Sequence, residues 1–220
     1  MQPEINIVEK EDIVAIVHIV TDTVLTNEVY FCELDSAAGD GDFGMSLAKG
    51  FKVIKEDILD KDQIKDADIG SFFRRCGMVL IENCGGASGP LWGTAFLEAG
   101  KYSKAKNSLT LQEFAELGEA FVYGVQKRGK AIVGDKTLLD ALIPAVLVLK
   151  ESAQDGGNFI SAMGKAVKAA EAGTEATKIM VAKKGRATYL GERSIKHPDA
   201  GAVAISVIIK DVYEQFFLTT

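Results

Sequence analysis

The stretch FGMSLAKGFKVIKEDI (residues 43–58) shows a pattern that repeats along most of the chain. Its large apolar residues stand at offsets of 0, 4, 7 and 11 positions and are Leu47, Phe51, Ile54 and Ile58. Because an α-helix completes a turn about every 3.6 residues, side chains at these offsets line one face of a helix. We therefore predict a helix whose apolar face packs against a core.

The same spacing recurs on both sides of this stretch. Further sets of four apolar residues predict amphipathic helices that start near Ile13, Ile69, Phe114 and Leu139. Residues 110–113 (TLQE) form a capping box ahead of the third of these helices. Pro144 lies within the fourth, where we expect it to kink or shift the helix.

The remaining segments also favour helices. Residues 158–184 are rich in Ala, Lys and Glu, which are common in helices. The last segment admits two interpretations, because the β-branched residues from Val203 to Ile209 suit a strand, whereas the helical spacing continues as far as Phe216. We predict a helix there, which gives about eight helices and no convincing strand alternation.

The organisation is that of one domain. The sequence has no internal repeat, low-complexity tract or proline-rich linker, and QDGGN (residues 154–158) indicates a turn between helices. We predict an all-α fold in which residues 1–220 form a single domain of antiparallel helices joined by glycine-rich loops. In an up-and-down bundle, alternate loops lie at the same end. Several glycine-rich loops are therefore expected to meet there in one site.

Composition excludes several classes of protein. Of the 220 residues, 47% are hydrophobic and 25% are charged, as in globular domains, and no apolar run reaches the roughly 18 residues of a membrane span. The net charge of −6 and the pI near 5.1 argue against nucleic acid held by bulk electrostatics. The start, MQPEINIVEKED, lacks the basic and then apolar layout of a secretory signal. The three cysteines are an odd number, and we expect them to be reduced thiols and not a set of disulfides. We predict a cytoplasmic protein without nucleic-acid or membrane partners.

The strongest chemical signal is LDSAAGDGDFG (residues 34–44), which leads into the first helix described above. Asp35, Asp40 and Asp42 stand at offsets of 0, 5 and 7 positions. Bringing three carboxylates together is costly unless a cation neutralises them. Oxygen ligands favour Mg²⁺ or Ca²⁺, and the spacing of these three residues is not that of an EF-hand. The alternative is a turn and helix cap with solvated acids. The apolar context of Asp35 favours the metal.

Three further loops each admit two interpretations. GGASGP (residues 85–90) suits a phosphate-binding loop or a tight turn between helices. Residues 129–137 suit helix caps or a nucleotide contact. Residues 183–201 form a polar connector that is long for a compact domain, and its Arg186 and Arg193 suit a phosphate clamp or a solvated basic surface.

Taken together, four stretches resemble the nucleotide-binding L subunit of the dihydroxyacetone kinase family. They are LDSAAGDGDFG (34–44), GGASGPLWGT (85–94), GDKTLLDALIPA (134–145) and KKGRATYLGERSIKHPDAG (183–201). The resemblance implies an eight-helix antiparallel barrel with a nucleotide site in the loops at one end. It also implies ADP or ATP, two Mg²⁺ ions, and a separate K subunit that binds dihydroxyacetone covalently through its own histidine.

The resemblance also implies roles for single residues. It makes Asp35, Asp40 and Asp42 the Mg²⁺ ligands and Arg186 the catalytic residue. It places residues 44–46 and 87–88 against the phosphates and residues 199–201 over the base. The full set of implied nucleotide-binding positions is Phe43, Gly44, Met45, Ser46, Ala87, Ser88, Gly129, Leu138, Arg186, Asp199, Ala200 and Gly201.

Two positions depart from the family's usual pattern. Phe43 stands where many relatives have His, so this residue is expected to serve through its backbone N–H. HPDAG (residues 197–201) replaces the commoner H-x-D-P-G, and it retains Asp199 and Gly201.

The implied activity is phosphoryl transfer to dihydroxyacetone, or a related small keto-sugar, on the K subunit. Two modes stay open: a bound ADP that a phosphotransferase-system protein rephosphorylates, which the family's habit favours, or free exchange of ATP. One rival is a nucleotide-sensing module that docks to a transcriptional regulator, and another is a Mg²⁺-dependent phosphatase. The sequence also leaves a homodimer open.

Overall fold

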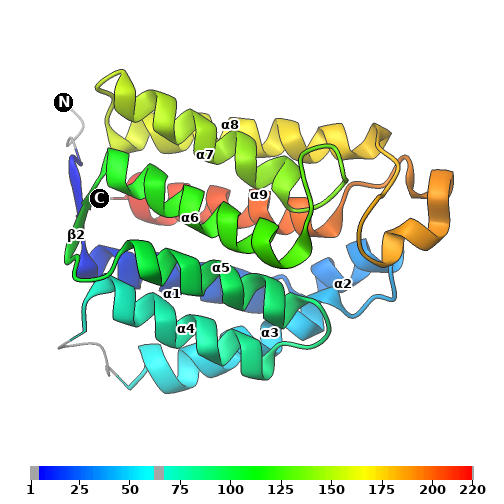
Figure 1. The fold of residues 1–220 in the computed structure, drawn as a ribbon, viewed down its shortest axis with the longest axis horizontal. Helices are drawn as coiled ribbons and strands as arrows, with labels where there is room; N and C mark the ends of the chain where they lie inside the picture. Colours follow the sequence, from blue (N-terminus) through cyan, green and yellow to red (C-terminus); the bar gives the residue numbers. More distant parts are fainter. Residues whose placement is uncertain (1–4, 62–66, 220) are drawn as a thin grey trace.

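The computed structural model describes residues 5–61 and 67–219 and is built almost entirely from helices (Figure 1). The predicted single domain of residues 1–220 also contains residues 1–4, 62–66 and 220, which lie outside the described residues. The elements in chain order are β1 (Ile7–Glu9), α1 (Lys10–Thr26), α2 (Glu28–Ser36), α3 (Phe43–Ile54), η1 (Lys55–Leu59), α4 (Ile69–Asn83), α5 (Ser88–Tyr102), β2 (Ser108–Thr110), α6 (Leu111–Gly129), α7 (Leu139–Gln154), α8 (Phe159–Ala176), η2 (Thr177–Ile179), η3 (Arg186–Ser194), α9 (Ala200–Val212) and η4 (Tyr213–Phe217).

Eight of these helices form a closed ring. Helices α3 to α9 each pack against the next, and α1 closes the ring by packing against both α9 and α3. Successive members run in opposite directions along the molecule (Figure 1). Helix α2 continues α1 after a bend of 58° and packs against α3. The predicted all-α barrel of eight antiparallel helices is therefore confirmed.

The two ends of the ring differ. At one end, β1 and β2 pair antiparallel with Ile7 opposite Thr110, and the N- and C-terminal elements lie close by (Figure 1). At the other end lie the loops that follow α2, α4, α6 and α8 (Figure 1). This is the arrangement expected when every second loop of an antiparallel ring falls at the same end.

Local signals fix where several helices begin. The predicted capping box is present, because Thr110 Oγ1 accepts the Glu113 N–H at 3.3 Å and the Glu113 carboxylate accepts the Thr110 N–H at 2.9 Å. Side-chain oxygens of Asp68, Asn158 and Asp199 cap α4, α8 and α9 in the same way. Helix α9 also confirms that the last apolar segment is helical and not a strand.

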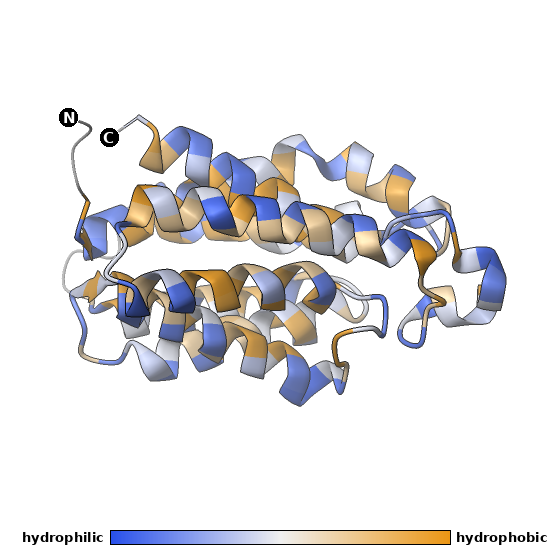
Figure 2. Ribbon diagram, turned by 90° about the horizontal axis from the view of Figure 1, so that it is seen from above, coloured by the Kyte–Doolittle hydropathy of each residue, from blue (hydrophilic) through white to orange (hydrophobic). Residues whose placement is uncertain are grey.

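The core lies inside the ring. Figure 2 shows hydrophobic and hydrophilic residues alternating along the helices, as expected when each buries one face. Trp92 is only 4% exposed, and its ring lies 6.0 Å from that of Phe51 and 6.1 Å from that of Phe121, edge to face in both pairs. The side chains leave an apolar cavity of about 200 Å³ among the helices.

Within the described residues, no single helix is both long and apolar enough to cross a membrane. Helices α1 and α2 meet that length and composition test only when they are joined across their bend.

Helix α7 continues through Pro144 as one helix, and the expected kink or shift stays a prediction. Proline has no N–H, and the carbonyl of Asp140, four residues earlier, therefore loses its helical donor. At this carbonyl α8 makes a close approach through Gly173, where a methyl group would collide with the Asp140 carbonyl oxygen. The contact between α7 and α8 thus requires glycine at position 173.

We predict that Gly173→Ala lowers the free energy of unfolding by about 1–3 kcal/mol, the usual cost of an overpacked contact. Gly164→Ala is the matched control on the same helix, because its new methyl group would meet only the end of the Tyr213 side chain, with the hydroxyl at 3.0 Å and ring carbon Cζ at 3.2 Å, and no backbone atom. Alanine in place of glycine favours a helix, so Gly164→Ala is expected to be neutral or stabilising. Urea denaturation followed by circular dichroism measures both, and equal effects would contradict this account.

Candidate functional site

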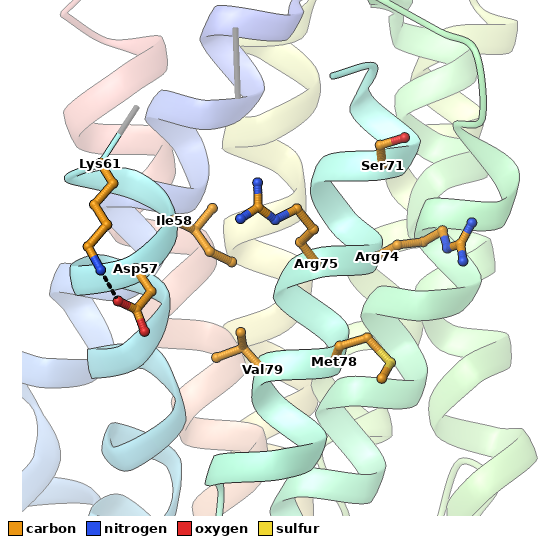
Figure 3. Close-up of a pocket in the computed structure, with 8 residues that line it drawn as sticks. All are labelled: Asp57, Ile58, Lys61, Ser71, Arg74, Arg75, Met78 and Val79. Carbon is orange, nitrogen blue, oxygen red and sulfur yellow. Dashed lines mark hydrogen bonds and ion pairs between the residues drawn. The ribbon is translucent and has the colours of Figure 1, made fainter. Parts of the chain in front are cut away.

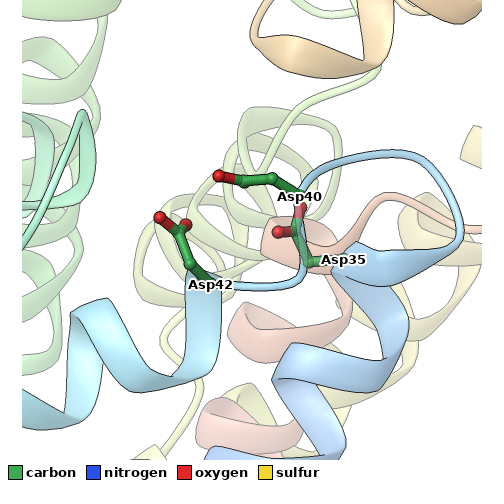
Figure 4. A group of neighbouring side chains, drawn as sticks. All are labelled: Asp35, Asp40 and Asp42. Atoms are coloured by element: carbon green, nitrogen blue, oxygen red, sulfur yellow. The ribbon is translucent and has the colours of Figure 1, made fainter.

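The predicted acidic loop joins α2 to α3. Asp35 lies in the last turn of α2, Asp40 lies in the loop, and Asp42 directly precedes α3. One carboxylate oxygen from each residue lies within 4.8 Å of the other two, and Figure 4 shows the three side chains beside one another. Oxygen ligands at this spacing match what Mg²⁺ and Ca²⁺ require. The donor set therefore fits a hard divalent cation.

Two glycines allow the loop to fold around Asp35. The Asp35 carboxylate accepts the Gly41 N–H at 2.9 Å, and Gly41 has a φ of +76°, in the left-handed region that favours glycine. At Gly39 a methyl group would overlap the Asp35 carboxylate. The glycine-rich composition of this loop thus has a local physical reason besides any ligand.

A positive charge already lies against the acidic residues. The Arg186 guanidinium forms an ion pair with Asp40, and its second terminal nitrogen lies 4.0 Å from Asp42 Oδ2. Arg186 is the first residue of η3, so it comes from the C-terminal part of the chain, whereas the three carboxylates come from the N-terminal part. This pairing offsets part of the repulsion among the carboxylates. It also puts a guanidinium, which binds phosphate in a bidentate manner, beside the candidate metal site.

A cleft of about 540 Å³ opens beside the carboxylates, within the usual size range of small-molecule sites. All four connections at this end of the ring contribute to it, so the expected convergence of loops is observed. Trp92 forms part of its wall as well as part of the core. The predicted site residues that line it are Asp35, Asp40, Asp42, Phe43, Ala87, Ser88, Gly129, Leu138, Arg186, Asp199, Ala200 and Gly201.

Residues 44–46 lie beside the cleft and not in its lining. Gly44 packs so closely on α2 that a methyl group there would collide with a carbonyl oxygen of that helix. The Met45 N–H donates to Cys32 Sγ at 3.2 Å, and the Ser46 N–H donates to the Asp42 carbonyl at 2.8 Å. Gly44 and Met45 fix α3 against α2, the Ser46 bond belongs to the first turn of α3, and the contact of all three residues with phosphate stays a prediction.

Sequence reasoning missed the burial of charged residues near the start of α7, among them Lys136 in the preceding loop and Asp140 in the first turn of the helix. Lys136 and Asp140 are each 2% exposed, and Lys136 also lines the cleft. The Asp140 carboxylate accepts the Gly134 N–H at 2.6 Å and the Thr137 N–H at 2.7 Å, and so shapes the loop. The only available signal was that three charged residues, Asp135, Lys136 and Asp140, stand in the otherwise largely apolar stretch GDKTLLDALIPA (134–145).

Asp199 combines a structural role with an unusual ionisation. Its Oδ1 accepts the Ala202 N–H at 2.8 Å, and its own N–H donates to Thr177 Oγ1 at 2.9 Å. Burial raises the pKa of Asp199 to about 7, although the Ala202 N–H and the positive charge of Lys136 oppose the rise. The carboxyl group therefore titrates near neutral pH at the edge of the cleft.

A second hollow, of about 650 Å³, lies on the outer face of the ring between η1 and α4 (Figure 3). Its Lys61 ammonium pairs with Asp57, and Arg74 and Arg75 point to opposite sides of α4. Among the described residues, the one group of carboxylates placed to hold a metal is in the first cleft, not in this hollow. The first cleft is therefore the candidate site.

Comparison with known proteins identifies the family. The profile of the DAK2 domain matches residues 37–214. The chain belongs to the DAK2 domain family. It is 39% identical over 189 residues to the ADP-binding subunit DhaL of the PEP-dependent dihydroxyacetone kinase of Escherichia coli (strain K12), which covers 86% of this chain and 89% of that subunit. The family resemblance expected from the four motifs is confirmed.

Larger DAK2 proteins contain the same unit. The triokinase/FMN cyclase of Homo sapiens is 37% identical over 89% of this chain, which corresponds to 33% of that protein. The crystal structure of the dihydroxyacetone kinase from C. freundii in complex with AMP-PNP and Mg²⁺ superposes with a TM-score of 0.71 and 25% identity, over 98% of this chain and 35% of that one. This chain thus spans about a third of these two larger relatives.

The Asp199 carboxyl group makes stability depend on pH. Its pKa is higher in the folded protein than in the unfolded chain, where Asp titrates near about 3.9, so the charged form is disfavoured by folding. This cost grows as pH rises from about 4 to about 7 and is fully present above that. We predict that Asp199→Asn, whose amide oxygen can still cap α9, raises the free energy of unfolding most at about pH 8 and least at about pH 4. Urea denaturation across this range tests it, and a difference independent of pH would refute it.

Proposed function

We propose that this chain is the nucleotide-binding subunit of a dihydroxyacetone kinase complex, which transfers a phosphoryl group to dihydroxyacetone or a related small keto-sugar on a separate K subunit. The observation that carries the proposal is the set of three carboxylates, with Arg186 paired to it, at the mouth of a cleft of about 540 Å³. The likeness to an ADP-binding subunit over most of both chains supports it. We propose that residues 1–220 act as one nucleotide-binding domain.

The residues around the cleft suit magnesium-bound ADP or ATP. Asp35, Asp40 and Asp42 would hold Mg²⁺, as two ions by resemblance, and bound Mg²⁺ would neutralise charge on the phosphates. The loop of residues 85–88 offers backbone N–H groups at the start of α5, where a helix favours an anion. The deeper wall is apolar and suits an adenine ring, and it includes Leu91, Trp92, Val125 and Leu138.

Arg186 is the catalytic residue that we propose. Its guanidinium already reaches the carboxylates that would hold the metal, so it lies close to where the transferring phosphoryl group would bind. A guanidinium at that point stabilises negative charge that develops in the transition state. The described lining of the cleft contains no histidine, which suits an acceptor that is activated on the partner subunit.

The proposal also covers the phosphoryl donor and the cellular compartment. We propose that ADP stays bound as a cofactor and is rephosphorylated by a phosphotransferase-system protein, in the cytoplasm, in keeping with the PEP-dependent relative. ATP exchange, a nucleotide-sensing role toward a transcriptional regulator, and assembly as a homodimer remain as alternatives. A sensor would bind Mg²⁺-ADP and transfer no phosphoryl group when mixed with a K subunit, which separates it from the kinase.

Asp40→Asn tests the metal-dependent part of this function. We predict that it weakens binding of Mg²⁺-ADP at least about tenfold, because a charged metal ligand is lost, while binding of ADP in excess chelator changes much less. The control is Asp155→Asn, an exposed carboxylate in the turn between α7 and α8 at the opposite end of the ring. Isothermal titration calorimetry measures all three proteins. Unchanged Mg²⁺-ADP affinity in a folded Asp40→Asn protein would rule out the proposed metal site.

Nucleotide retention distinguishes the two donor modes. If ADP is a cofactor, we expect the purified protein to keep it through prolonged dialysis against magnesium buffer and to release it on denaturation. Chromatography of the released nucleotide identifies it. Rapid replacement of bound ADP by labelled ATP would instead establish the exchange mode.

A further inference from the structure

The side chain of Lys136 is buried in an unusual environment. It is 2% exposed, and among the residues that the structure describes its ammonium group donates hydrogen bonds to backbone carbonyl oxygens and to no carboxylate. The acceptors and their distances from Nζ are Thr177 at 2.7 Å, Met180 at 3.2 Å, Ser194 at 2.8 Å and His197 at 2.7 Å. An ammonium has three hydrogens, so the longest of these contacts shares a donor.

These four carbonyls flank one loop. Two precede residues 181–193 and two follow them, and Arg186 lies between; we call residues 181–193 the Arg186 loop. The Lys196 N–H also donates to the Lys178 carbonyl at 2.7 Å, and the Ala182 N–H donates to Ser194 Oγ at 3.1 Å. The two ends of the loop therefore meet at a neck, and the Lys136 ammonium lies at its centre.

The neck needs a cation because several carbonyl oxygens point at one place. A buried carbonyl without a donor is costly, and one ammonium satisfies all four. The backbone at Lys136 has a φ of +60°, a conformation that residues with side chains rarely adopt. The chain holds this conformation at the residue whose ammonium group contacts carbonyls on both sides of the neck.

The position of Arg186 follows from this closure. Its side chain is 55% exposed, and its ion-pair partners in the structure are Asp40 and Asp42, across the mouth of the cleft. An exposed ion pair alone does little to order a loop. Closing the neck joins the two ends of the loop, lowers its conformational entropy and leaves Arg186 within reach of the carboxylates.

We propose that Lys136 is a positioning residue, whose ammonium closes the neck of the Arg186 loop and so holds the Arg186 guanidinium over Asp40 and Asp42. The structural part of this inference stands without any ligand. Only the effect on nucleotide binding rests on the proposed function.

Hydrogen exchange of the nucleotide-free protein tests the structural part. In Lys136→Met we expect amides of the Arg186 loop to exchange at least about tenfold faster, with the ring helices unchanged. Lys130→Met is the matched control, because Lys130 lies on the same loop with a similar φ of +54° but has an exposed side chain. Unaltered protection in Lys136→Met overturns the proposal. If Lys136→Met fails to fold, a ¹H–¹⁵N spectrum of the wild-type protein provides a second test. A slowly exchanging lysine ammonium signal that is lost in Lys136→Arg supports the closed neck. Absence of any such signal refutes it.

A double-mutant cycle on Mg²⁺-ADP affinity tests the link to Arg186. If Lys136 acts through Arg186, then Arg186→Gln and Lys136→Met each weaken binding about tenfold, and the double variant is also weakened about tenfold. Independent effects would multiply to about a hundredfold, and that result overturns the positioning role. Failure of the wild-type protein to bind Mg²⁺-ADP would refute the proposed function instead, and hydrogen exchange would still decide whether Lys136 closes the neck.

Discussion

Repulsion among three carboxylates in one short loop is the constraint on which the rest of the site depends. Their oxygens lie within 4.8 Å of one another, where two unit charges repel by about 1 kcal/mol in water and by several times more near a protein surface. The loop between α2 and α3 holds no positive charge of its own. The Arg186 guanidinium supplies one from the connector before α9, so the first and last connections of this end of the ring are electrostatically coupled.

The ring of helices brings the coupled connections together, and buried polar groups fix their conformations. Antiparallel packing brings four connections to one end without fixing the conformation of any of them. Asp140 shapes one connection by accepting two backbone N–H groups, and Lys136 fixes another through four carbonyls. Lys136 lies in the loop between α6 and α7, and Asp140 lies in the first turn of α7 directly after that loop. That loop therefore organises the site, while the acidic loop supplies the ligands.

The features that could be predicted from the sequence are those encoded over short distances. The helical face of Leu47 and Phe51 repeats within a few residues, and the three acidic side chains stand within one loop. The role of Lys136 could not be predicted, because its partners are backbone carbonyls 41 to 61 residues away, and a carbonyl has no sequence signature. Gly44 shows a different limit: close approach of a phosphate and close packing of α2 both require the absence of a side chain, and the sequence does not distinguish them. The two strands have three residues each, too few to show alternation.

The charges of the site also indicate why metal and nucleotide should bind together. Taken alone, the three carboxylates and the guanidinium paired with them carry a net charge of −2, which disfavours a phosphate group beside them without a cation. Divalent cations without a nucleotide would reverse the sign and place positive charge against Arg186. Two divalent cations bound together with the phosphates of a nucleotide bring these groups closer to neutrality than the nucleotide alone would. The proposed neck strengthens this dependence, because it keeps the backbone at Arg186, and with it the guanidinium, near the carboxylates.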